Sequence, residues 1–193
     1  MIKLSEKLCK DYIVRAYGTA CKSGFHDEEL SVEHMMMLVL SEVSEAVEAD
    51  RKGQRADYAG YEACLKETGD ALLSFSKFAK DGVEDELADV AIRLFDFCGA
   101  LCIVPDLSVC DDALYANYCS LCSKMSFCEC CFVLSAIICR CDGASRDEIC
   151  TIVGSALTFL FCMAKDMCVD LERHIELKMK YNELRPKKHG KKY

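Results

Sequence analysis

The chain has 193 residues, of which 52% are hydrophobic, and a net charge of −8. This length suits one domain or two fused halves, and the acidic balance excludes a general nucleic-acid-binding surface. With only 2 prolines and 10 glycines, long stretches contain no helix breaker, which predicts a single all-α domain over 1–193 built as a helical bundle. The sequence contains neither common type of Gly-rich phosphate loop.

Four helices are predicted in the first half from the spacing of apolar residues. They cover 4–22, 31–52, 57–80 and 83–102. Ser31 is the expected N-cap of the second helix and Gly53 its stop. Pro105 closes the fourth helix.

The second half is predicted to repeat this plan. Residues 39–53 can be laid over 133–143, and 83–107 over 145–171. This indicates a duplication in which two helix pairs form one bundle. The resulting parts are a metal-binding half (1–107), a degenerate half (108–171), and a C-terminal helix end with a basic tail (172–193).

The 16 cysteines are predicted to be reduced thiols in a cytoplasmic protein, because the N-terminal segment lacks the apolar stretch of a secretory signal. A group between Cys119 and Cys131 contains a C-x-x-C pattern, which raises zinc as an alternative. Apolar residues alternate with these cysteines in a helical pattern, which favours core packing. The uncharged stretch from Ile149 to Ala164 is shorter than the ~20 residues of a membrane span, so no membrane partner is expected.

Two acidic patterns lie on predicted helices. Glu42, Glu45 and Glu48 are spaced by three residues, as are Glu86 and Asp89. Residues three apart share a helix face, and both helices are too apolar to lie fully in solvent. If the helices pack antiparallel, the carboxylates converge at a seam where like charges repel one another. An all-oxygen site of this kind favours Mg²⁺, with Mn²⁺ as a substitute.

Three other interpretations compete with this metal site. The acids could be exposed and paired with Arg51, Lys52 or Arg93. A di-iron site is disfavoured, because none of the four histidines has a Glu three residues before it. The segment Glu67-Thr-Gly-Asp70 competes with Glu86 and Asp89 as the second acidic pair.

The segments LVLSEVSEAVEADRKG and EDELADVAIRLFDFCG resemble the paired acidic motifs of the MazG-like all-α nucleoside triphosphate pyrophosphohydrolases. The end of the chain, DLERHIELKMKYNELRPKKHGKKY, is similar to the C-terminus of a bacterial and phage branch of that superfamily. The resemblance implies hydrolysis of a nucleoside triphosphate to a monophosphate and pyrophosphate. It implies a magnesium site formed by Glu42, Glu45, Glu86 and Asp89. It also implies a substrate site formed by Lys178, Asn182, Arg185 and Lys188.

Ser41 departs from the family pattern, which often has two adjacent glutamates at this point. Catalytic roles are therefore expected from Glu42 and Glu45, with Glu48 as a possible base. In the second half Ala136, Cys139 and Thr151 stand opposite Glu42, Glu45 and Asp89, so that half would act as a scaffold. A homodimer is one expected state, and a monomer is expected instead if the scaffold replaces a partner subunit. The alternative function is a non-catalytic regulatory protein that binds nucleotide or metal.

Overall fold

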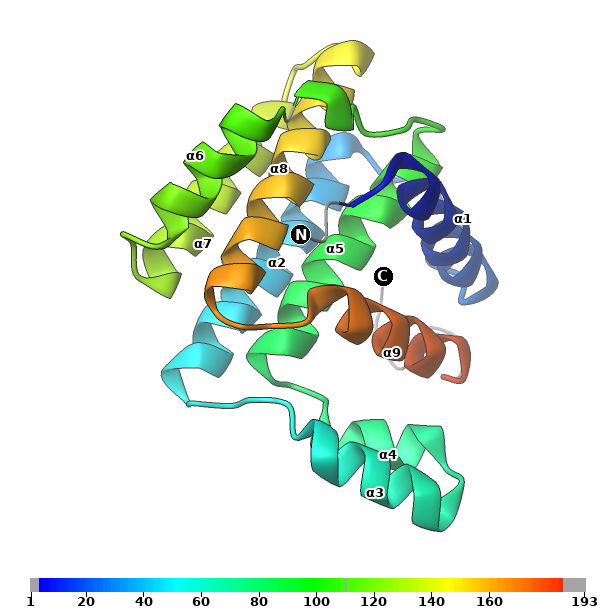
Figure 1. Cartoon of the computed structure of the whole chain (residues 1–193). Coiled ribbons are helices and arrows are strands. Elements are labelled where there is room, and N and C mark those ends of the chain that lie inside the picture. Colours follow the sequence, from blue (N-terminus) through cyan, green and yellow to red (C-terminus); the bar gives the residue numbers. More distant parts are fainter. Residues whose placement is uncertain (1–3, 110, 186–193) are drawn as a thin grey trace.

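The computed structural model describes residues 4–109 and 111–185, and this part of the chain is helical without strands (Figure 1). The expected all-α bundle is confirmed. The helices are α1 (Glu6–Lys22), α2 (Val32–Arg51), α3 (Tyr58–Thr68), α4 (Ala71–Phe78), α5 (Val83–Ala100), α6 (Asp112–Cys122), α7 (Phe127–Ile138), α8 (Arg146–Asp166) and α9 (Leu171–Glu183). The 3₁₀ turn η1 (Leu107–Val109) lies between α5 and α6, and η2 (Cys139–Cys141) lies between α7 and α8.

Local capping explains where the helices begin and end. The Ser31 side chain accepts a hydrogen bond from the backbone N–H of His34, which confirms it as the N-cap of α2. Gly53 has a φ of 66°, a left-handed conformation that stops the helix at little cost. The helix predicted over 57–80 is wrong as a single element. Gly69 takes a φ of 69° and Asp70 caps a new helix, so the segment is a hairpin of α3 and α4.

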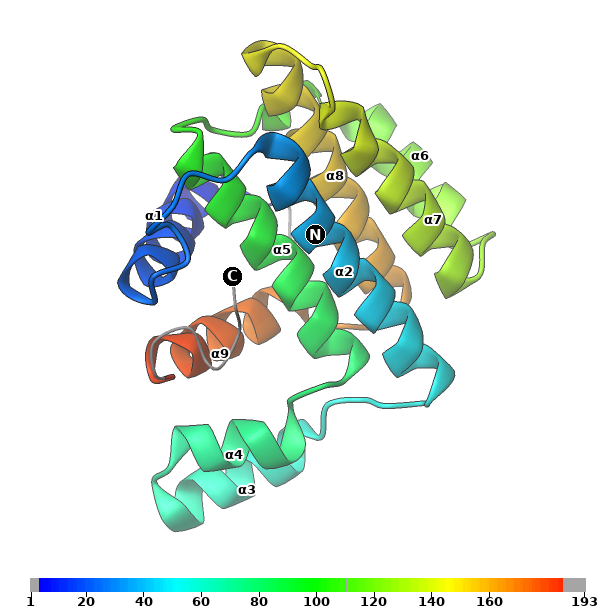
Figure 2. The same cartoon turned by 180° about the vertical axis from the view of Figure 1, so that it is seen from behind.

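Helix α5 occupies the centre of the bundle. It runs antiparallel to α2, and α1 and α9 pack against it on one side (Figure 2). On the other side α7 packs against α2, and α8 packs against both α7 and α5. The α3–α4 hairpin lies at one end and contacts α9. Although α9 follows the second half in sequence, it packs on the first half.

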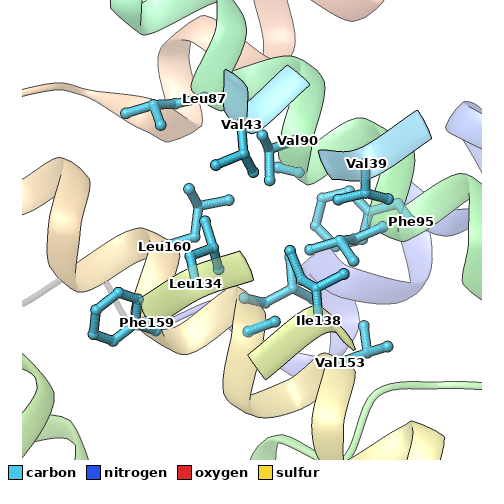
Figure 3. Packing of buried hydrophobic residues seen from close by; sticks show 14 of the residues in the cluster. Val39, Val43, Leu87, Val90, Phe95, Leu134, Ile138, Val153, Phe159 and Leu160 are labelled. Carbon is cyan, nitrogen blue, oxygen red and sulfur yellow. The ribbon is translucent and has the colours of Figure 1, made fainter. Parts of the chain in front are cut away.

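The main core lies between α2, α5, α7 and α8 (Figure 3). Val39 and Val43 of α2 meet Leu134 and Ile138 of α7, with α5 and α8 closing the other sides. Cys122, Cys130 and Cys131 are buried in the same cluster, and burial raises the pKa of the Cys131 thiol to about 12. The burial of these three agrees with the expected packing role, whereas Cys119 is half-buried and Cys128 is exposed.

Helix α8 contains the uncharged stretch from Ile149 to Ala164. It is the one helix among the described residues that is long and apolar enough to cross a membrane, and 67% of its most apolar window is buried inside the bundle. Leu157 and Leu160 on this helix are fully buried. The apolar surface of α8 is therefore used largely in core packing.

Candidate metal centre and adjoining cleft

Three of the four expected metal ligands meet where α2 crosses α5. Carboxylate oxygens of Glu42, Glu86 and Asp89 lie within 4.8 Å of one another. Oxygens on opposite sides of an octahedral Mg²⁺ are about 4.2 Å apart, so a small movement of these side chains would suit this ion. Glu42 and Glu86 are buried and Asp89 is half-buried. The cluster is therefore shielded from water rather than spread over an exposed helix face.

The remaining acidic candidates, Glu45 and Glu48, lie outside the three-residue cluster. Glu45 is exposed and lies three residues after Glu42 on α2. Burial is the main cause that raises the pKa values of Glu42 and Glu86, and the charge of Glu45 adds to this effect. Glu48 is exposed and forms ion pairs with Arg51 at 3.1 Å and Lys52 at 3.3 Å.

The competing pair does not belong to the cluster. Glu67 and Asp70 are both exposed, on either side of the break at Gly69. Asp70 uses its carboxylate to cap α4 by accepting from the Leu73 backbone N–H at 2.9 Å. The Ser41 hydroxyl, which stands in place of a family glutamate, donates to the Leu38 carbonyl of its own helix.

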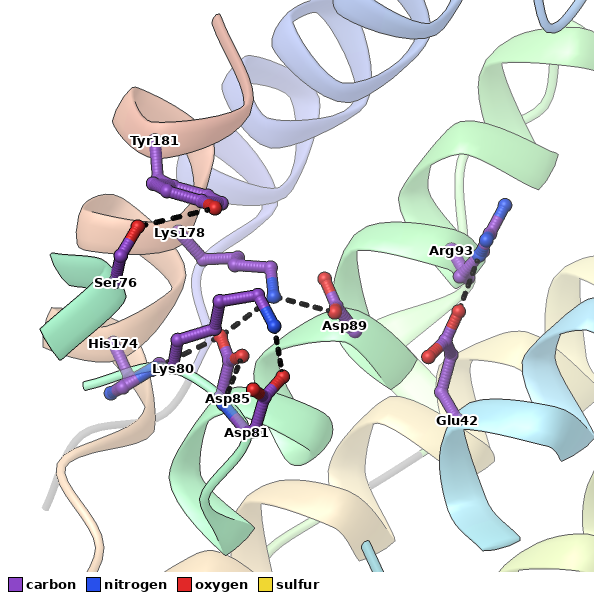
Figure 4. A network of polar contacts seen from close by, with 10 residues as sticks. All are labelled: Glu42, Ser76, Lys80, Asp81, Asp85, Asp89, Arg93, His174, Lys178 and Tyr181. Carbon is purple, nitrogen blue, oxygen red and sulfur yellow. Dashed lines mark hydrogen bonds and ion pairs between the residues drawn. The ribbon is translucent and has the colours of Figure 1, made fainter. Parts of the chain in front are cut away.

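A buried lysine from α9 joins this acidic region (Figure 4). Lys178 Nζ lies 2.7 Å from Asp85 Oδ1 and 2.7 Å from Asp89 Oδ2. Burial alone would raise the pKa of Asp85, but the Lys178 ammonium lowers it to about 2. Burial lowers the pKa of Lys178, and the charges of Asp89 and Asp85 more than offset this effect, so its pKa rises. Both groups are therefore charged at neutral pH.

Arginine supplies the second internal cation. Arg93 Nε donates to Glu42 Oε1 at 3.0 Å. Burial and the charge of Asp89 raise the pKa of Glu42, and Arg93 opposes them. This pairing matches the competing interpretation of Arg93 as a salt-bridge partner, but it concerns only one carboxylate of the cluster.

The internal cations do not balance the acids. Glu42, Asp85, Glu86 and Asp89 carry four negative charges when ionised, against two positive charges on Arg93 and Lys178. Glu86 has no ion-pair partner among the described residues. Burial, followed by the charges of Asp89 and Asp85, raises its pKa to about 8. With Glu86 protonated at neutral pH, the acids exceed the cations by one negative charge. A divalent cation that displaces this proton would neutralise the two excess charges of the fully ionised cluster.

Beside the carboxylates lies a cleft between α1, α5 and α9. Three expected site residues line it, namely Lys178, Asn182 and Arg185 of the α9 region, and Lys188 lies outside the described residues. Glu42 and Asp89 form part of the wall, and four cationic residues accompany them: Arg15, Arg93, Lys178 and Arg185. The cleft thus joins a cation-binding cluster to groups that attract phosphate.

Several residues of this region had no predicted role. Asp85 lies between Glu84 and Glu86 in the first turn of α5, and its sequence position alone does not separate it from exposed acids. Arg15 enters the cleft from α1, where it is held by Glu176 at 2.8 Å. His174 is buried between Tyr58, whose hydroxyl lies 3.0 Å from Nδ1, and Asp85, whose Oδ1 lies 3.5 Å from Nε2.

Comparisons of the chain with protein-family models, with curated proteins and with solved structures give no match. The resemblance to the MazG-like pyrophosphohydrolases therefore rests on the motif residues named above, and the geometry of the cleft is an independent observation beside it.

Proposed function

We propose that the chain is a Mg²⁺-dependent nucleoside triphosphate pyrophosphohydrolase that converts an NTP or dNTP and water to the monophosphate and pyrophosphate. The observation that carries the proposal is the meeting of Glu42, Glu86 and Asp89 beside a cleft lined by four cationic side chains. A divalent cation bound by the carboxylates would take over the charge compensation that Arg93 and Lys178 now provide, and these two cations could then pair with phosphate oxygens.

In this proposal Glu42, Glu86 and Asp89 would hold Mg²⁺, with Mn²⁺ as a substitute, and the exposed Glu45 would remain outside this ligand set. The ion supplies charge neutralisation on the triphosphate and lowers the pKa of water. Lys178 and Arg93 would bind phosphate oxygens, and Arg185 would do so from the end of α9. Glu45 would accept the proton of the attacking water, whereas Glu48, held by Arg51 and Lys52, has no proposed role.

Product analysis in ¹⁸O-labelled water tests the reaction. We expect Mg²⁺-dependent release of pyrophosphate, with the label in the monophosphate because water attacks the α-phosphorus. Asp89→Asn should reduce kcat by at least about 100-fold, whereas Asp147→Asn, an exposed Asp on α8, should retain full activity. Label in free phosphate, or activity that survives Asp89→Asn, would contradict the proposal.

The competing proposal is a regulatory protein that binds nucleotide without turnover. It is favoured by the ion pairs that Glu42 and Asp89 already make with Arg93 and Lys178. Under it, nucleotide and Mg²⁺ bind but no product forms over many hours.

We also propose that the second half is a scaffold derived by duplication. The packing of α7 on α2 and of α8 on α5 pairs the helices that the sequence alignment makes equivalent. Because Ala136, Cys139 and Thr151 replace the acids, this half should bind no metal. One Mg²⁺ per active chain is expected in equilibrium dialysis, and two would contradict the scaffold role.

A further inference from the structure

The two ends of the cleft differ in chemistry. One end contains Glu42, Asp89 and Lys178, which is the proposed position of the metal and the triphosphate. The other end is marked by Phe25 and Asp96, which together with Arg93 also line a small neighbouring cavity beside His26. No role has been given to this second end.

The separation of the ends fits the length of a nucleotide. Asp89 and Asp96 are seven residues apart on α5, which corresponds to about 10 Å along the helix axis. A triphosphate held at Asp89 would therefore place its base close to Asp96. The facing wall, formed by α1 and its C-cap residue, consists mainly of small side chains that leave room for a planar ring, namely Ala16, Thr19, Ala20 and Ser23.

Asp96 is held in place as a hydrogen-bond acceptor. His26 Nε2 lies 2.7 Å from Asp96 Oδ1, and the imidazole packs against the Tyr17 ring at 4.9 Å between centroids. The hydrogen bond with Asp96 raises the pKa of His26, which favours a charged pair. Within the described part of the chain, the second oxygen, Oδ2, has no hydrogen-bond or ion-pair partner. The Asp96 side chain is 16% exposed and lines the cleft, so it can be reached by a ligand bound there.

A carboxylate accepts hydrogen bonds and donates none when ionised. Guanine presents two adjacent donors, the ring N1–H and the 2-amino group. Adenine and cytosine place a ring-nitrogen acceptor next to their amino group, and uracil and thymine place carbonyl oxygens on both sides of N3–H. Each of these acceptors would be repelled by the carboxylate.

Resting on the proposed function, we propose that Asp96, oriented by His26, makes the enzyme selective for guanine nucleoside triphosphates by accepting hydrogen bonds from the N1–H and 2-amino group of the base. Asn182 lies on the α9 wall of the same cleft, and its amide can donate to a carbonyl or hydroxyl group of the same substrate. The recognised class is thus GTP and dGTP rather than nucleotides in general.

Steady-state kinetics with GTP, ITP, ATP, CTP and UTP tests this selectivity. ITP differs from GTP only by the missing 2-amino group, so it is the matched substrate. We expect kcat/KM for GTP to be about 10- to 100-fold higher than for ATP, CTP and UTP. It should be about 10-fold higher than for ITP. Asp96→Asn should bring the GTP and ITP values together, mainly through KM, and Asp147→Asn should leave the ratio unchanged.

The outcomes separate this inference from the function on which it rests. Turnover of all five triphosphates at similar kcat/KM would overturn the guanine selectivity and leave the hydrolase intact. The wild-type ratio of GTP to ITP gives this answer even if Asp96→Asn fails to fold. A GTP preference that persists unchanged in folded Asp96→Asn would also overturn the assignment. Failure to hydrolyse or bind any triphosphate would remove the proposed function and this inference together.

Discussion

The ammonium of Lys178 lies 2.7 Å from Asp89 Oδ2, so a side chain of α9 is paired with a proposed metal ligand of α5. The same nitrogen lies 2.7 Å from Asp85, which is 1% exposed. One cation therefore fixes the last described helix to the centre of the bundle and compensates two acids. This contact also explains why the C-terminal helix belongs to the site although some sixty residues of sequence precede it in the second half.

Lys178→Met is expected to lower the free energy of unfolding by about 3–5 kcal/mol, because it leaves Asp85 buried without its counter-ion. Lys180→Met, on an exposed position of the same helix, should change it by less than about 0.5 kcal/mol. Urea denaturation of both variants measures the difference. Equal stabilities would show that Lys178 does not compensate a buried charge.

The raised pKa of Glu86 predicts a pH dependence of stability in metal-free buffer. Its pKa in the folded chain is about 8, above the ordinary value of 4.5. Between these values the folded chain holds a proton that the unfolded chain has released, so stability falls as pH rises from 4.5 to 8. Glu86→Gln removes this contribution and should be more stable than the wild type at pH 8, by about 1–2 kcal/mol.

Denaturation in the presence of a chelator, repeated at several pH values, measures this effect. The pKa of His26 is also raised, so its contribution to stability is likewise lost as pH rises. Both proteins contain His26, and this contribution therefore cancels when their stabilities are compared. A Glu86→Gln variant that is less stable than the wild type at pH 8 would show that the carboxylate is ionised and compensated.

Close packing of α1 on α5 shapes the cleft and can be tested with two glycines. A Cβ added at Gly99 would lie 2.4 Å from Tyr17 Cβ, whereas one added at Gly18 meets nothing within 4 Å. Gly99→Ala should therefore destabilise the protein by about 1–3 kcal/mol. Gly18→Ala should stabilise it by about 0.5–1 kcal/mol, since alanine favours the helix. Thermal unfolding distinguishes the two variants. A Gly99→Ala variant as stable as the wild type would contradict the close packing of α1 on α5.

Much of the fold was predictable because it depends on local signals. Ser31 and Gly53 mark the ends of α2 by capping and by a left-handed turn, and both were found from the sequence. The break at Gly69 was missed, since a single glycine within an otherwise helical pattern does not reveal its φ. Asp70 was instead interpreted as a possible metal ligand, although its short side chain serves as a cap.

The site was predictable in part for the same reason. The spacing of Glu86 and Asp89 puts them on one face, and their position opposite Glu42 followed from antiparallel packing. The role of Asp85 could not be predicted, because its partner Lys178 is 93 residues away and reaches it only through tertiary packing. Asp96 was also missed, since its contact with His26 spans 70 residues and follows no helical spacing.

Metal binding should be visible as thermal stabilisation. A ligand that binds only the folded chain raises its stability by RT ln(1 + [L]/Kd), about 2.7 kcal/mol at one hundred times Kd. The melting temperature should therefore rise with Mg²⁺ and, more steeply, with Mn²⁺, which binds carboxylate sites with higher affinity. Asp89→Asn should lose the shift, because it removes a ligand from the cluster with Glu42 and Glu86. Asp147→Asn should keep the shift. Ca²⁺ serves as the control ion, because a specific site should give it a different shift in melting temperature from Mg²⁺, whereas ionic screening should give both ions the same shift. If every divalent ion and the Asp89→Asn variant give the same shift, the effect is general ionic screening and the carboxylate cluster is not a metal site.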